Sequence, residues 1–170
     1  GIMKCGFVGI VGMPNSGKST LLNEIIEQKI TIVSSKPQTT RQSLSGIRTN
    51  EDYQLIFFDA PGFVKPKQGL FEFLAKEFGR IIEKSDHILC VISHDQEDCL
   101  AIHQILEKLE ATQKPVSYLF SKSDLKMNPF VEQLISKLEE KKAHLISYSI
   151  KNRDNQSLFG FLEELAQELP

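Results

Sequence analysis

Short apolar runs alternate with amphipathic stretches along most of this chain, and this order restricts the fold more than any other feature. The run from Cys5 to Val11 is unbroken and rich in β-branched residues, which is typical of a buried strand. Residues 18–27 then repeat apolar side chains at the spacing of one helix face. Three strand–helix pairs follow, at 87–93 with 97–109, 116–120 with 130–141, and 144–149 with 158–169. Strands separated by helices pair in parallel, so we expect a sheet with helices on both faces.

One pair of strands breaks this parallel pattern. Residues 42–49 and 53–58 have strand character, and the turn residues between them predict a hairpin. A predicted helix at 70–84 follows. We therefore expect residues 3–170 to form a single three-layer α/β domain with about five helices. Its sheet is expected to be mostly parallel and six-stranded, with one antiparallel edge strand.

The composition excludes several classes of protein. The net charge is −2 over 170 residues, which gives no general attraction to nucleic acid or to an anionic membrane. No apolar run approaches the ~20 residues that a membrane-spanning helix needs. Three cysteines lack metal-ligand spacing and are interpreted as reduced, buried thiols: Cys5, Cys90 and Cys99. Four histidines also lack such spacing and are interpreted as structural or exposed: His87, His94, His103 and His144.

The pattern G-x-x-x-x-G-K-[ST] runs from Gly12 to Ser19, between the first strand and the first helix, which is the context that its mechanism requires. The glycines let backbone N–H groups converge on phosphate oxygens, and the helix N-terminus adds positive partial charge. Lys18 is expected to reach the β- and γ-phosphates of a nucleoside triphosphate, and the Ser19 hydroxyl to bind Mg²⁺. The residues expected to bind phosphate are Gly12, Pro14, Asn15, Ser16, Gly17, Lys18, Ser19 and Thr20.

Two further segments carry groups suited to Mg²⁺ and the γ-phosphate. Asp59 ends the strand at 53–58 and opens an Asp-Ala-Pro-Gly turn, where its carboxylate can hold Mg²⁺ directly or through water. The backbone N–H of Gly62 can reach the γ-phosphate. The loop at 36–41 holds two threonines, and one hydroxyl can complete the Mg²⁺ shell until hydrolysis releases it. Spacing alone does not choose between Thr39 and Thr40.

The segment Ser121-Lys122-Ser123-Asp124 follows the strand at 116–120 and predicts recognition of guanine. A carboxylate there accepts hydrogen bonds from guanine N1–H and the 2-amino group, whereas adenine offers an acceptor at N1 and no 2-amino group. The Lys122 stem can lie along the base. Ser147-Tyr148-Ser149 ends the last strand, where a backbone N–H can bond guanine O6. The residues expected to bind the base are Ser121, Lys122, Asp124, Ser147, Tyr148 and Ser149.

Four segments together resemble the Era-type GTPases, within the translation-factor branch of P-loop GTPases: GMPNSGKSTLLNEI, KPQTTR, DAPGF and SKSD. The resemblance covers residues 4–169 and implies a Ras-like P-loop GTPase fold that binds GTP and GDP with Mg²⁺ and hydrolyses GTP slowly. It also implies a molecular switch in assembly of the small ribosomal subunit with its 16S rRNA. The resemblance further implies a monomeric cytoplasmic protein that can associate peripherally with the inner membrane.

The resemblance also assigns roles to single residues. By motif alignment, the Mg²⁺-binding threonine is Thr40, so the expected metal ligands are Ser19, Thr40 and Asp59. The expected catalytic groups are Lys18, Thr40 and Gly62. Asn15 matches an asparagine that in related GTPases helps bind K⁺ beside the phosphates, where a cation would neutralise charge in the transition state.

The chain departs from the family pattern at several positions. Ser121 stands where the base motif has asparagine, and Tyr148 stands where the last motif has alanine. Phe63 follows the D-A-P-G turn, where Ras-type enzymes orient water with a glutamine, so we expect slow intrinsic hydrolysis. The family continues into a C-terminal KH RNA-binding domain, which we expect to be absent from these residues.

Two other functions remain open from the sequence. One is a GTP/GDP-responsive binding module with negligible hydrolysis, which Phe63 and Ser121 allow. The other is a P-loop kinase or ATPase, against which Asp124 and the absence of an arginine-rich lid segment argue.

Overall fold

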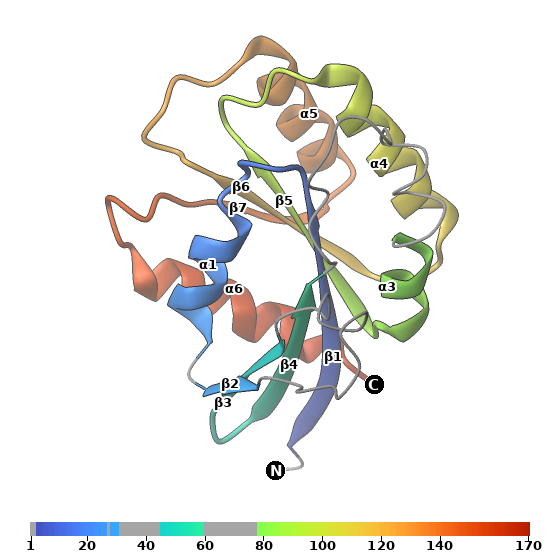
Figure 1. Cartoon of the computed structure of the whole chain (residues 1–170), viewed down its shortest axis with the longest axis vertical. Helices are drawn as coiled ribbons and strands as arrows, with labels where there is room; N and C mark the ends of the chain where they lie inside the picture. The colour runs from blue at the N-terminus through green and yellow to red at the C-terminus, as the bar shows by residue number, and fades with distance from the viewer. Residues whose placement is uncertain (1–2, 27, 31–44, 60–77) are drawn as a thin grey trace, which may run out of the picture.

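The computed structural model describes residues 3–26, 28–30, 45–59 and 78–170. Within these ranges, seven strands form one sheet in the order β2-β3-β4-β1-β5-β6-β7 (Figure 1). The strands are β1 (Lys4–Gly12), β2 (Gln28–Ile30), β3 (Ser45–Thr49), β4 (Tyr53–Asp59), β5 (His87–Ser93), β6 (Val116–Ser121) and β7 (His144–Ser147). The helices are α1 (Lys18–Ile25), α3 (Gly79–Lys84), α4 (Cys99–Ala111), α5 (Pro129–Glu140) and α6 (Asn155–Gln167).

The predicted fold class, an α/β domain with a mostly parallel sheet, is confirmed. Strands β4, β1, β5, β6 and β7 pair in parallel, and β3 is antiparallel to its neighbours. The predicted hairpin joins β3 to β4, where the Asn50 side chain accepts hydrogen bonds from the backbone N–H groups of Asp52 and Tyr53. The sheet also contains β2, which the sequence analysis did not predict, so β3 is not the edge strand. Three residues are too few to produce a readable alternation of apolar and polar positions.

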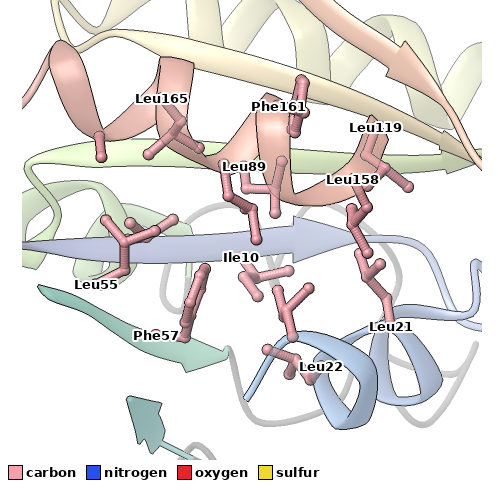
Figure 2. Close-up of a cluster of buried hydrophobic side chains, with 14 of the residues drawn as sticks. Ile10, Leu21, Leu22, Leu55, Phe57, Leu89, Leu119, Leu158, Phe161 and Leu165 are labelled. Atoms are coloured by element: carbon pink, nitrogen blue, oxygen red, sulfur yellow. The ribbon is translucent and has the colours of Figure 1, made fainter. Parts of the chain in front are cut away.

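Side chains of the central strands divide between two cores. All seven residues of β5 are buried, and successive residues point to opposite faces of the sheet. Leu89 and Val91 belong to a core that α1 and α6 cover, which Figure 2 shows. Ile88, Cys90 and Ile92 belong to a second core that α3, α4 and α5 cover. A strand buried on both faces has to be apolar throughout, which explains the unbroken apolar run in the sequence.

Side-chain caps set where two helices begin. Asp98 accepts a hydrogen bond from the N–H of Ala101 and starts α4, and Asp154 accepts one from the N–H of Ser157 and starts α6. As a result α6 begins three residues before the predicted start at residue 158. In the part of the chain that the structure describes, no helix exceeds 13 residues, and none has the length and apolar character needed to cross a membrane.

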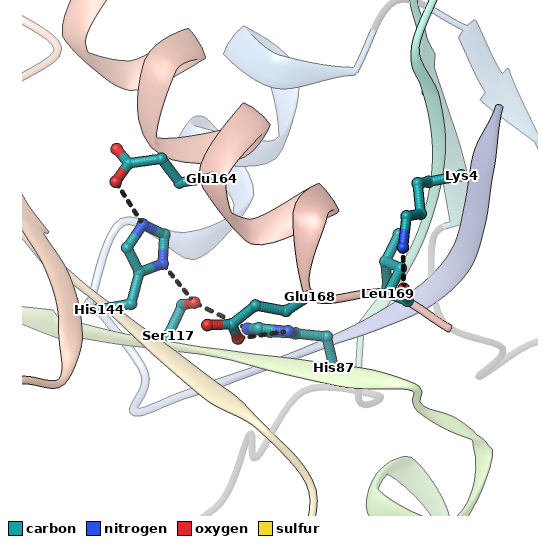
Figure 3. Close-up of polar contacts among 7 residues, drawn as sticks. All are labelled: Lys4, His87, Ser117, His144, Glu164, Glu168 and Leu169. Atoms are coloured by element: carbon teal, nitrogen blue, oxygen red, sulfur yellow. Dashed lines mark hydrogen bonds and ion pairs between the residues drawn. The ribbon is translucent and has the colours of Figure 1, made fainter. Parts of the chain in front are cut away.

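A buried polar chain lies at the amino-terminal ends of the last three strands (Figure 3). Ser117 Oγ is 2.7 Å from His87 Nε2 and 2.7 Å from His144 Nδ1. Glu168 lies 3.7 Å from the other nitrogen of His87, and Glu164 of α6 lies 3.9 Å from the other nitrogen of His144. The His87 side chain is fully buried, and this burial, with a smaller effect of the charge on His144, lowers its pKa from 6.5 to about 4.

This arrangement predicts an acid-sensitive stability. Between pH 6.5 and 4, the unfolded chain binds a proton at His87 that the folded chain does not bind. The free energy of unfolding therefore falls as the pH is lowered through this window, by roughly 2 kcal/mol at pH 5 for this residue alone. Urea unfolding at pH 8 and pH 5 measures the loss.

The His87→Gln variant keeps a polar group next to Ser117. Between pH 8 and pH 5, its free energy of unfolding should fall by roughly 2 kcal/mol less than that of the wild type. The exposed His103, changed to Gln, is the matched control and should behave like the wild type. An equal loss in the wild type and His87→Gln would show that His87 is not the titrating group.

Candidate functional site

The predicted site residues within the described ranges gather at one edge of the sheet. The loop after β1, the carboxyl end of β4, the segment after β6 and the segment after β7 all lie at the carboxyl ends of parallel strands (Figure 1). β1 has β4 on one side and β5 on the other. In open α/β sheets, ligands bind at the carboxyl edge where the strand order reverses in this way. Two predicted site residues lie outside the described residues, namely Thr40 and Gly62. The same is true of the predicted switch loops at 30–41 and 60–69, apart from Ile30.

The loop between β1 and α1 has the backbone shape of an anion-binding turn. Gly17 has φ +83° and Asn15 has φ +68°, a left-handed region that glycine adopts freely and asparagine tolerates. Gly12 lies so close to β5 that a Cβ there would come within 2.9 Å of the Val91 carbonyl oxygen. No side chain caps the first turn of α1, which begins at Lys18. Its N–H groups are therefore left for another acceptor, and the helix N-terminus favours an anion.

Two predicted phosphate and metal ligands meet beside this loop. Lys18 opens α1 and Asp59 ends β4, and Lys18 Nζ lies 2.5 Å from Asp59 Oδ1. Both side chains are mostly buried, with 13% and 14% of their surface exposed. Ser19 and Thr20 follow Lys18 in the first turn and are exposed. Oxygen ligands from Ser19 and Asp59 are of the kind that Mg²⁺ prefers.

The segment after β6 is bonded directly to the phosphate loop. The Ser121 hydroxyl donates to the Ser16 carbonyl oxygen, and Lys122 Nζ donates to the Asn15 carbonyl oxygen at 2.5 Å. Two consecutive carbonyls of the phosphate loop are therefore held by two consecutive residues of the base segment. Ser121 is too short to extend far over a base, but it is long enough to make this bond. The Lys122 side chain also passes over Gly17, where Lys122 Cε would lie 3.8 Å from a Cβ.

Asp124 is held as a hydrogen-bond acceptor. The Ser149 hydroxyl donates to Asp124 Oδ1 at 2.7 Å, and Lys151 Nζ lies 3.8 Å from Oδ2. The bond from Ser149 lowers the pKa of Asp124, and the Lys151 charge adds a smaller effect in the same direction. The carboxylate is therefore ionised at neutral pH and can only accept hydrogen bonds.

Within residues 147–149, where the sequence predicts a backbone N–H for guanine O6, the N–H of Tyr148 is already bonded. Its N–H donates to the Phe120 carbonyl oxygen at 2.9 Å, and its own carbonyl accepts from Ser123 N–H at 3.2 Å. Its ring is buried in the core and its hydroxyl donates to the Asn155 side chain. Tyr148 therefore fixes the backbone after β7.

Lys151, which lies beside Asp124 in the structure, was not among the predicted site residues. Ser149 donates to one oxygen of the Asp124 carboxylate, and Lys151 lies 3.8 Å from the other. The signal in the sequence was the Ser-x-Lys spacing of residues 149–151, which the preceding Ser147-Tyr148 pair obscured. Ser147 instead bonds to His94, with its Oγ 3.1 Å from His94 Nε2.

A phosphate-shaped loop joined to an acceptor-only carboxylate at the switch point of a parallel sheet defines a P-loop nucleotide-binding domain. The model of a GTPase family described as "50S ribosome-binding GTPase" matches residues 7–122, and the chain belongs to this family.

Curated relatives support the Era-type assignment made from the motifs. The chain is 39% identical over 167 residues to a GTPase Era of Thermoanaerobacter sp. strain X514, covering 98% of this chain and 55% of the relative. It is 34% identical over 169 residues to GTPase Era of Clostridium novyi strain NT, covering 99% of this chain and 58% of the relative. The chain thus spans a little over half the length of the curated relatives that it matches.

Solved structures agree with these relatives. An Era variant from Aquifex aeolicus bound to GDP and AlF4⁻ has a TM-score of 0.73 and 28% identity, covering 99% of this chain and 58% of that chain. A structure of Era with MgGDPNP and nucleotides 1506–1542 of 16S ribosomal RNA has a TM-score of 0.74 and 30% identity, with the same coverage. The predicted resemblance to Era-type GTPases and the Ras-like fold are confirmed.

The bond between the base segment and the phosphate loop can be tested directly. Ser121→Ala removes the donor to the Ser16 carbonyl and should weaken GDP binding about three- to tenfold, the range expected for one neutral hydrogen bond. Fluorescence titration with labelled GDP measures the dissociation constant. Ser123→Ala, two residues along, is the control because the Ser123 contact in the structure comes from its backbone. Equal affinities for the two variants would contradict a role for the Ser121 bond.

Proposed function

We propose that this domain binds GTP and GDP with Mg²⁺, hydrolyses GTP slowly, and acts as a molecular switch in assembly of the small ribosomal subunit. The observation that carries the proposal is the ionised Asp124, which Ser149 holds and which the neighbouring Lys122 connects to the phosphate loop. This arrangement supports recognition of the base and the phosphates of one ligand by one connected surface.

Guanine fits the chemistry of the base segment. Asp124 accepts hydrogen bonds from guanine N1–H and the 2-amino group, and adenine cannot supply either donor. The backbone N–H of Ile150, next to Ser149, is our proposed donor to guanine O6, since the Tyr148 N–H is already bonded to Phe120. The Lys122 stem, which crosses above Gly17, would cover one face of the base.

The phosphates would bind the loop from Gly12 to Thr20, with the uncapped N–H groups of α1 directed at phosphate oxygens. Lys18 and Asp59 pair with each other in this structure, and nucleotide binding would separate them. Lys18 would then bind phosphate, and Asp59 would join Ser19 and Thr40 as ligands of Mg²⁺. The metal, when bound, supplies charge neutralisation at the phosphates.

Hydrolysis would depend on charge neutralisation and positioning. Lys18, the backbone N–H groups of the loop and the Gly62 N–H stabilise charge on the phosphate that is transferred, while Thr40 responds to the presence of the γ-phosphate. Phe63 cannot orient water as a glutamine does, which supports a slow intrinsic rate. We propose K⁺ as an additional cation next to the phosphates at Asn15, whose side chain is exposed in the loop. Unchanged hydrolysis rates between Na⁺ and K⁺ buffers would reject the K⁺ site.

The ribosomal role rests on the relatives. The family model carries a description that names the 50S subunit, whereas one similar Era structure contains a segment of 16S ribosomal RNA. The Era structure covers 99% of this chain, whereas the family model matches residues 7–122. We therefore propose the small subunit and its rRNA as partners. The remaining proposals follow the family: a cytoplasmic monomer with peripheral inner-membrane association, with rRNA binding shared with a KH domain.

The alternative is a GTP/GDP-responsive binding module with negligible hydrolysis. Phe63 favours it, because the chain lacks the water-orienting glutamine of Ras-type enzymes. Phosphate release measured with the protein alone and with small ribosomal subunits separates the two functions. The switch hypothesis predicts slow release that the subunits accelerate, and absence of release in both conditions would favour the binding module.

Replacement of the base acceptor gives a sharper prediction. Asp124→Asn replaces a carboxylate oxygen with an amide N–H group, which repels the guanine donors and can pair with the 2-oxo group of xanthine. GDP affinity should fall at least about 100-fold and XDP affinity should rise, as expected for a site whose polar group is left unpaired by the wrong ligand. Competition against labelled nucleotide measures both. Asp52→Asn, in the exposed turn before β4, is the control, and parallel behaviour of the two variants would remove Asp124 from the base site.

A further inference from the structure

His94 is a buried residue at the carboxyl edge of the sheet that the motifs do not include. It directly follows β5 and is 5% exposed. Its backbone N–H donates to the Ser121 carbonyl oxygen at 2.9 Å, and its carbonyl accepts from the Asn128 N–H at 2.9 Å. Ser121 opens the base segment, and Asn128 lies four residues beyond Asp124, directly before α5. The backbone of His94 therefore holds the chain on both sides of Asp124.

The imidazole of His94 makes a third connection. His94 Nε2 lies 3.1 Å from Ser147 Oγ at the end of β7. β7 has four residues, and among the strands that the structure describes it pairs with β6 alone, because it is the last strand of the sheet. Burial lowers the pKa of His94, although the charges of Asp124 and Asp95 act in the opposite direction, so the ring is neutral at physiological pH. A neutral ring has one donor and one acceptor nitrogen, and a serine hydroxyl can pair with either.

Ser147 leads directly into the residues that hold the base acceptor. Tyr148 is fixed between Phe120 and Ser123 by its backbone, and the next residue, Ser149, donates to Asp124. The ring of His94 thus holds the strand end from which the Ser149 hydroxyl reaches Asp124. Among the described residues, His94 is the only hydrogen-bond partner of the Ser147 side chain.

We propose that His94 is a positioning residue for guanine recognition, which fixes Ser147 and thereby the turn that sets the orientation of Asp124. The inference rests on the proposed function, because it assigns His94 to the guanine site of that function. It adds the buried side chain of His94 to the proposed site, next to the loops that are proposed to contact the base.

The discriminating measurement is the ratio of the affinities for GDP and IDP. Hypoxanthine keeps the N1–H and O6 groups of guanine and lacks only the 2-amino group. If Asp124 loses its orientation, the contact to the 2-amino group weakens, so GDP loses more affinity than IDP. A variant that only reduces the stability of the fold would lower the melting temperature and leave this ratio unchanged.

The test compares the wild type with three single variants: Ser147→Ala, His94→Leu and His94→Gln. Ser147→Ala removes the same hydrogen bond from the other side with little change in packing, so it remains informative even if His94→Leu fails to fold. We expect Ser147→Ala and His94→Leu to lower the GDP/IDP affinity ratio about three- to tenfold, the effect of one neutral hydrogen bond. His94→Gln places an amide near Ser147 and should restore most of the ratio. His103→Gln, on the exposed side of α4, is the control histidine.

The double variant His94→Leu/Ser147→Ala should be no worse than the more affected single variant, because both remove one bond. Unchanged GDP/IDP ratios in both single variants, or fully additive effects in the double variant, would overturn the positioning role while the wild type still prefers GDP to ADP. A wild type without that preference would overturn both the inference and the proposed guanine site.

Discussion

The hydrogen bonds from Ser121 and Lys122 to the carbonyls of Ser16 and Asn15 connect the two halves of the site. The residues that they join are more than 100 positions apart in the sequence, with separations of 105 and 107. A phosphate loop alone would bind many phosphorylated ligands, and a carboxylate alone would bind many donors. Because the two are joined at backbone level, a ligand has to satisfy both at a fixed separation, which is the physical basis of nucleotide selectivity in this account.

The sheet makes this connection possible. Parallel pairing from β4 to β7 brings the carboxyl ends of the strands to one edge. The apolar content of β5, β6 and the second half of β1 keeps these segments largely buried on both faces. Cys5 and Phe7, in the first half of β1, are exposed, so Cys5 is not the buried thiol that the sequence predicted. The buried polar side chains at this edge are four serines and one histidine: Ser16, Ser93, His94, Ser121 and Ser149. The Ser121 hydroxyl donates to the Ser16 carbonyl oxygen, His94 bonds to Ser147, and the Ser149 hydroxyl donates to Asp124. Acidic and basic groups at the opposite edge form the separate chain around Ser117, so stability and ligand recognition depend on different ends of the strands.

Much of this arrangement was predictable from the sequence, because local pattern and local structure agree. The unbroken run at Cys5–Val11, the phosphate loop after it and the strand–helix alternation each depend on nearby residues. The exceptions depend on distant ones. β2 exists because β3 offers it an edge to pair with, and the start of α6 depends on the Asp154 cap. The bond from Ser149 to Asp124 depends on the register of β7 against β6, where Phe120 pairs with Ser147. The spacing of residues 147–149 alone does not predict that register.

The central claim is that one connected surface recognises guanine and phosphate together. The most direct test is displacement of labelled GDP from the wild-type protein, in Mg²⁺, by unlabelled GDP, ADP and pyrophosphate. Our account predicts that GDP displaces the label at concentrations at least about 100-fold lower than ADP, and that pyrophosphate is weaker than GDP. The reason is that ADP and pyrophosphate both leave the guanine-binding half of the site unsatisfied. Displacement by ADP at the same concentration as GDP would contradict it.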